Sequence, residues 1–220
     1  MLPLRDENPR RSTPIFTLLI ILANLVVFLY QVTLPPRAEL QFFQEFAMIP
    51  ARIPLAFTNP SVTFSQAFVP LLTSTFLHGS LLHLAGNMWF LWVFGDNVED
   101  RFGHFTYLMF YLICGVGASV VHTLFNLDSR IPAVGASGAI SGAMGAYFVL
   151  FPRARVLTWI PPLFILPLPA FVVLVMWFLL QFFGGLQSLG AQAAGGVAFW
   201  AHVGGFVLGI LLTIALRGRR

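Results

Sequence analysis

Long apolar runs constrain this chain more than any other feature of its sequence. The first run, Ile15 to Leu34, has about the 20 residues that a helix needs to cross the hydrocarbon core of a bilayer. It is longer than the apolar core of a signal peptide, and no small-residue cleavage site follows it, so we expect a retained helix. Of the 220 residues, 58% are hydrophobic and only 9% are charged, unlike a soluble domain. The sequence therefore predicts an integral membrane protein.

Hydropathy predicts an all-α fold, a polytopic bundle of six membrane-spanning helices. We expect the spans at about residues 15–34, 79–97, 104–126, 136–151, 164–184 and 197–216. Residues 1–13 are expected to be a short, disordered cytoplasmic tail, and residues 14–220 a single membrane domain. The long segment 35–78 is too apolar for a freely solvated loop, so we expect part of it to lie in the interfacial layer.

The arginines predict the orientation of the bundle. Lysine does not occur, and an N-terminus in the cytoplasm would leave three arginines outside and nine inside; these nine are Arg5, Arg10, Arg11, Arg101, Arg153, Arg155, Arg217, Arg219 and Arg220. Because positive charge collects on the cytoplasmic side, the chain is expected to have both ends inside. The arginines thus indicate topology and not a nucleic-acid partner.

Polar residues within the spans are few, and they are expected to lie in one layer. Ser137 precedes Arg153 by 16 residues, and His202 precedes Arg217 by 15. At a helical rise of ~1.5 Å per residue, both lie roughly 22 to 24 Å above the cytoplasmic side. His83 belongs at a similar depth, with Asn87 one helical turn deeper. Such groups are costly in hydrocarbon and usually have a function.

Small residues follow these polar groups at a spacing typical of close helix packing. Gly138 and Gly142 form one GxxxG pair, and Gly205 and Gly209 form another. Gly135 precedes the serine in an irregular stretch, where glycine suits a turn that brings the chain to this position. We therefore expect the helices that carry Ser137 and His202 to approach closely.

Serine and histidine together indicate nucleophilic catalysis. A neutral histidine can take the proton of a serine hydroxyl, so Ser137 and His202 satisfy the minimum for a catalytic dyad. Asp128 would make a triad only if its loop folded back. The backbone N–H of Ser137, the imidazole of His83 and the amide of Asn87 could stabilise an oxyanion. The single cysteine, Cys114, excludes a disulfide within one chain, and we expect no metal or cofactor.

These motifs resemble those of the rhomboid intramembrane serine proteases. The resemblance rests on "GASG" around Ser137, "HLAGN" with His83 and Asn87, and "AHVGGFVLG" with His202, and it covers residues 69 to 216. It implies that Ser137 is the nucleophile and His202 the general base, with the oxyanion site named above. The sequence departs from the family in having Ser141 where many members have an aromatic residue. Also, no tryptophan precedes an arginine in the first loop.

The resemblance implies an enzyme that cleaves transmembrane protein substrates within the lipid bilayer, expected in a bacterial inner membrane. A non-catalytic rhomboid-like protein that binds membrane clients is one alternative, although that class is expected to lack the serine or the histidine. A small transporter is less favoured, because the sequence has no internal repeat and no acidic residue deep in a span. For Ser137 and Ser141 taken singly, a packing or hydrogen-bonding role is the structural alternative. The oligomeric state is left open.

Overall fold

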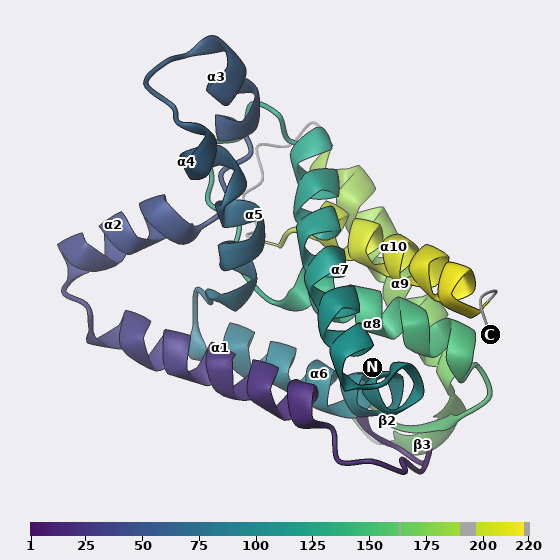
Figure 1. The fold of residues 1–220 in the computed structure, drawn as a ribbon. Helices are drawn as coiled ribbons and strands as arrows, with labels where there is room; N and C mark the ends of the chain where they lie inside the picture. Colours follow the sequence, from purple (N-terminus) through teal and green to yellow (C-terminus); the bar gives the residue numbers. More distant parts are fainter. Residues whose placement is uncertain (163, 190–196, 218–220) are drawn as a thin grey trace.

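The computed structural model describes residues 1–162, 164–189 and 197–217, and most of them are helical (Figure 1). Six helices form the main body: α1 (Ile15–Thr33), α6 (Leu81–Phe102), α7 (His104–Leu124), α8 (Ser137–Leu150), α9 (Ala170–Ser188) and α10 (Phe199–Arg217). Each predicted span overlaps one of these helices. The predicted helical bundle of a polytopic membrane protein is thereby confirmed.

The helices differ in how well they could cross a bilayer. Among the described residues, α1, α7, α9 and α10 are long and apolar enough to do so alone. Helix α6 meets the same test only together with residues 64–76, from which it is bent by 76°. Helix α8 has 14 residues and measures about 21 Å, less than the ~30 Å hydrocarbon core. Length and composition therefore support four or five spans, and the six-span topology stays a prediction.

Helix α8 lies inside the bundle. Helices α6, α7 and α10 pack around it (Figure 1). Every residue from Gly138 to Tyr147 is buried, and most of them are glycine, alanine or serine. Small side chains let neighbouring backbones approach closely where no hydrophobic effect drives helices together. The first residue of α8, Ser137, is thus surrounded by other helices.

The long connection between α1 and α6 folds into a series of short helices. They are α2 (Pro36–Phe46), α3 (Arg52–Thr58), α4 (Phe64–Phe68), α5 (Pro70–Thr73) and a 3₁₀ helix, η1 (Ser74–Phe76). The Arg52 guanidinium donates to the backbone carbonyl of Gln44 and to its side-chain oxygen. Met48 and Ala133 exchange two backbone hydrogen bonds, of 3.1 and 2.7 Å. The first contact joins α2 to α3 within the loop, and the second anchors the loop to the segment that leads into α8.

A three-stranded antiparallel sheet corrects two predictions. Its strands, in spatial order, are β1 (Leu2–Asp6), β2 (Arg155–Ile160) and β3 (Phe164–Pro169). The prediction of disorder in residues 1–13 was wrong for Leu2–Asp6, because this segment forms β1 and pairs with β2. The fifth helix was predicted from residue 164, but α9 begins only at Ala170. Pro167 and Pro169 lack an N–H group and disfavour helix in the residues before them, so this stretch is extended at a sheet edge.

The cytoplasmic end assigned from the sequence contains a buried carboxylate, Glu99, which joins three helices. It accepts hydrogen bonds from the backbone N–H groups of Phe16 (2.8 Å) and Thr17 (2.7 Å) at the start of α1, and from the Thr17 hydroxyl (2.7 Å). The imidazole of His104, the first residue of α7, lies 2.6 Å away. Because the first N–H groups of a helix have no acceptor within the helix, Glu99 completes the N-terminus of α1.

The N-terminal strand lies at the end of the bundle where the last helix, α10, terminates. Arg217, at the end of α10, donates to the carbonyl of Val149 near the end of α8 at 3.1 Å. Strand β2 follows α8 directly and pairs with β1, so the N-terminal segment lies at this end too (Figure 1). An even number of crossings would require this arrangement, and the bilayer orientation itself stays a prediction.

Candidate active site

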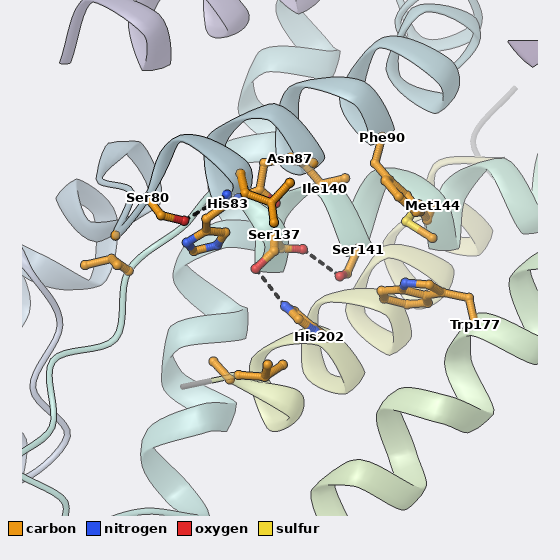
Figure 2. Close-up of a pocket in the computed structure, with 16 residues that line it drawn as sticks. Ser80, His83, Asn87, Phe90, Ser137, Ile140, Ser141, Met144, Trp177 and His202 are labelled. Atoms are coloured by element: carbon orange, nitrogen blue, oxygen red, sulfur yellow. Dashed lines mark hydrogen bonds between the residues drawn. The ribbon is translucent and has the colours of Figure 1, made fainter. Parts of the chain in front are cut away.

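The serine and histidine singled out from the sequence lie in hydrogen-bonding contact. The Nε2 atom of His202 is 2.7 Å from the Oγ atom of Ser137 (Figure 2). The two residues are 65 positions apart and belong to α8 and α10. As the first residue of α8, Ser137 has a backbone N–H with no acceptor inside the helix. Its hydroxyl therefore contacts an imidazole nitrogen, and its N–H group has no acceptor within α8.

Glycines set the distance between α8 and α10. A Cβ atom built on Gly205 would lie 2.1 Å from the carbonyl oxygen of Gly138, and one on Gly209 would lie 2.1 Å from that of Gly142. Real Cβ atoms do not approach backbone atoms so closely, so only glycine allows this backbone contact. The two GxxxG pairs face each other across one interface. This close approach brings His202 within reach of Ser137.

Gly135 directs the chain past the side chains expected at the oxyanion site. Its φ of +126° is a conformation that L side chains rarely adopt. A Cβ atom there would lie 2.7 Å from Nε2 of His83 and 3.5 Å from Nδ2 of Asn87. Its N–H donates to the carbonyl of Ser74 at 2.9 Å. Both α6 side chains thus lie against the turn that leads into Ser137.

A cavity of about 510 Å³ opens over these groups. Its lining comes from α6, α8, α9 and α10, and it includes His83, Asn87, Ser137 and His202 (Figure 2). Among the described residues that line it, none is acidic. Apolar side chains cover much of the remaining wall; they include Phe90, Ile140, Met144 and Trp177. The site therefore combines a few convergent polar groups with an apolar wall, which is typical of a ligand pocket.

The structure shows the surroundings of Ser141 and Asp128, whose roles the sequence left open. The Ser141 hydroxyl donates to the carbonyl of Ser137, one helical turn earlier, at 2.6 Å, and the residue lines the cavity. The Ser141 hydroxyl therefore has its hydrogen-bond acceptor within its own helix, as serine hydroxyls in helices often do. Asp128 is exposed in the loop after α7. Nδ1 of His202, the ring nitrogen that does not contact Ser137, has a neighbour other than Asp128.

That neighbour, Gln181, was missed in the sequence. Its side-chain oxygen, Oε1, lies 2.8 Å from Nδ1 of His202. The ring of Trp177, one turn earlier on α9, is centred 5.9 Å from the imidazole of His202. Gln181 lies in the predicted span 164–184, so a complete survey of the polar residues in that span would have found it. Its partner could not have been predicted, because that depends on how α9 packs against α10.

His78 was also missed. Although it precedes α6, it is only 1% exposed, and the Nδ2 group of Asn87 donates to its Nε2 atom at 2.9 Å. The Gln31 side chain exchanges two hydrogen bonds with the His78 backbone, of 3.0 and 3.2 Å. His78 therefore connects the end of α1 to the candidate oxyanion site. Within the described ranges, no group of three or more His, Cys, Asp or Glu side chains could hold a metal ion.

Comparison with known proteins identifies the family. A model of the rhomboid domain matches residues 65–219, more than half of the chain. The chain belongs to the rhomboid family. Among its rhomboid relatives, "Rhomboid protein 1, mitochondrial" of Saccharomyces cerevisiae is 29% identical over 158 residues, which cover 65% of this chain and 40% of that protein.

Two further rhomboid relatives come from a plant and an animal. "Rhomboid-like protein 11, chloroplastic" of Arabidopsis thaliana is 34% identical over 66% of this chain and 51% of its own length. "Presenilin-associated rhomboid-like protein, mitochondrial" of Homo sapiens is 30% identical over 66% of this chain and 35% of its own length. The matched segments thus cover between 35% and 51% of the length of these three relatives. The names of these relatives describe mitochondrial or chloroplastic proteins, so they do not support the prediction of a bacterial inner membrane.

Proposed function

We propose that this chain is an intramembrane serine endopeptidase that hydrolyses peptide bonds in or near the transmembrane segments of other membrane proteins. The observation that carries the proposal is the 2.7 Å contact between His202 Nε2 and Ser137 Oγ, in a cavity inside an apolar helical bundle. Membership of the rhomboid family supports it. The site residues supply a nucleophile, a base and oxyanion donors without a cofactor.

In the first step, Ser137 Oγ attacks the carbonyl carbon of the scissile bond while its proton passes to Nε2 of His202. The carbonyl π-electrons move onto oxygen, which becomes an oxyanion. The backbone N–H of Ser137, the imidazole of His83 and the amide of Asn87 are proposed to donate to it. The imidazolium then protonates the leaving nitrogen, the C–N bond breaks, and an ester to Ser137 remains.

In the second step, water hydrolyses this ester. Neutral His202 removes a proton from the water as its oxygen attacks the acyl carbon, and then returns the proton to Ser137 Oγ as the ester bond breaks. A helical substrate must unwind locally before the first step, because its carbonyl groups are otherwise engaged in internal hydrogen bonds. Polar lining of the cavity gives water a place in an otherwise apolar bundle.

A non-catalytic rhomboid-like protein that binds membrane clients is the alternative. Such a protein has no need of a hydrogen-bonded serine and histidine at the floor of a cavity, and both are present here. Binding of a client without cleavage would favour it. A transporter is not favoured, because the polar groups belong to one compact site at the start of a buried helix.

A serine-directed fluorophosphonate probe tests the proposal. In detergent, the wild type is expected to be labelled, as Oγ of Ser137 displaces fluoride from phosphorus. Ser137→Ala and His202→Ala are expected to lose labelling and cleavage of a transmembrane substrate while still folding, as judged by their thermal unfolding. Ser188→Ala, on α9 and outside the cavity, is a matched control that keeps both activities. Equal labelling of all four proteins would overturn the dyad.

A further inference from the structure

The side chain that faces the outer nitrogen of His202 is neutral. Oε1 of Gln181 lies 2.8 Å from Nδ1, while Nε2 of the same ring lies 2.7 Å from Ser137 Oγ. Both ring nitrogens are therefore engaged, one by α9 and one by α8. Three helices meet at this one imidazole, since His202 itself belongs to α10.

An amide oxygen can only accept a hydrogen bond, so its position determines the tautomer of the imidazole. With Oε1 opposite Nδ1, the single proton of neutral His202 resides on Nδ1. The lone pair of Nε2 is then directed at Ser137, where it can accept the hydroxyl proton. The opposite tautomer would present an N–H group to the serine oxygen and could not act as its base.

The neutrality of Gln181 suits its surroundings. In soluble serine proteases a carboxylate occupies the corresponding position and stabilises the imidazolium. A charged carboxylate inside an apolar helix bundle would carry a large desolvation cost, whereas a neutral amide offers an acceptor without that charge. Trp177, four residues earlier on α9, presents its ring to the same imidazole, so one face of α9 supports the histidine twice.

We propose that Gln181 is a positioning residue that holds His202 in the tautomer and orientation needed for base catalysis, which rests on the proposed peptidase function. Throughout the reaction the Nδ1 proton stays on the ring and is donated to Oε1. The mobile proton moves only between Ser137 Oγ, Nε2 and the leaving nitrogen. Helix α9 thereby completes a Ser-His-Gln arrangement built from three separate helices.

Two substitutions at position 181 separate hydrogen bonding from packing. Gln181→Met keeps the length of the side chain but removes the acceptor, so kcat is expected to fall about 10- to 100-fold with KM nearly unchanged. This scale, about 10- to 100-fold, is taken from metal sites, where partners that orient a metal-bound histidine through its other ring nitrogen have effects of this size. Gln181→Glu restores an acceptor oxygen at this position. The desolvation cost of the carboxyl group is expected to lower the unfolding temperature, whereas kcat of the folded variant is expected to recover to within about threefold of the wild type, because one hydrogen-bond acceptor replaces another.

Gln187→Met is the matched control, because Gln187 is exposed near the end of the same helix. It is expected to match the wild type in kcat, KM and thermal unfolding. A Gln181→Met variant with wild-type kcat would overturn the inference, and so would a Gln181→Glu variant as impaired as Gln181→Met, which would assign the effect to packing. Failure of the wild type itself to be labelled by the fluorophosphonate would instead overturn the proposed function.

Discussion

The Asn87 side chain contacts His78 and also lies beside the turn into Ser137, so we expect two separable effects of removing its amide group. Its Nδ2 group donates to the buried His78, and it lies beside the turn into Ser137, where the oxyanion is proposed to form. We expect Asn87→Ala to lower kcat by about 10- to 100-fold with little change in KM. Loss of one oxyanion donor usually costs ~10² to 10³, and here two other donors remain. Turnover of a transmembrane substrate measures this.

The same substitution leaves His78 without its donor, so the free energy of unfolding is expected to fall by about 1 kcal/mol, the lower end for an unsatisfied buried group. Kinetics measured well below the unfolding temperature separate this from the effect on catalysis. Asn126→Ala is the matched control, since the one hydrogen bond of the Asn126 side chain in the described structure is donated to the carbonyl of His122 near the end of α7. An unchanged kcat in Asn87→Ala would remove Asn87 from the oxyanion site.

At the level of elements, the contact between α8 and α10 decides whether the site is assembled. Since a Cβ on Gly209 would lie 2.1 Å from a backbone oxygen of α8, Gly209→Ala must push the two helices apart. We expect it to destabilise the fold by about 1 to 3 kcal/mol, the usual cost of overpacking. We also expect labelling by the fluorophosphonate to weaken, because His202 lies on the displaced helix. Thermal unfolding in detergent and labelling rates measure the two effects.

Gly86→Ala is the control for the effect on stability alone, because Gly86 lines the cavity. Gly86 lies within α6, and a Cβ there would have no neighbour within 4 Å, so its unfolding temperature is expected to stay equal or to rise slightly. If Gly209→Ala were as stable as Gly86→Ala and labelled normally, the glycine contact would not be what holds the site together.

At the level of the whole molecule, the packing of the N-terminal strand against α6 and α8 is expected to depend on pH. Asp6 of β1 accepts hydrogen bonds from Tyr147 (2.5 Å) and Asn97 (2.9 Å). Burial, with a smaller contribution from the nearby Asp96 carboxylate, raises the pKa of Asp6 from 3.8 to about 6. The folded state therefore keeps this proton to a higher pH than the unfolded state does. Its contribution to stability is complete below about pH 4 and is lost as the pH rises through about 6.

Asp6→Asn tests this, because an amide oxygen can accept both hydrogen bonds without acquiring a charge. The stability of Asp6→Asn minus that of the wild type is expected to be larger at pH 7.5 than at pH 5. Thermal unfolding and the rate of proteolysis in the segment before α1 measure this difference. Glu7→Gln, at the exposed next position, is the control and should show no such difference. A difference between Asp6→Asn and the wild type that is the same at both pH values would contradict the assignment.

Particular residues show how far the sequence could predict the site. Ser137 and His202 could be found because polar side chains are rare in apolar spans, and the rise of a helix places both at one depth. The glycines near them could be found because their four-residue spacing is a property of one helix. Gln181 could not be assigned, because a contact between α9 and α10 depends on the rotation of both helices. Strand β1 could not be found either, because its partner β2 is about 150 residues away.

The sequence by itself determined that this is a helical membrane protein, which helices carry the polar groups, and which glycines allow close packing. These properties follow from hydropathy and from spacing along single helices, which are local. Only the tertiary structure decided that Gln181 and Trp177 support His202, that His78 bonds to Asn87, and that the N-terminal segment joins a sheet. Those contacts join segments distant in sequence, and their geometry is set by the packing of the whole bundle.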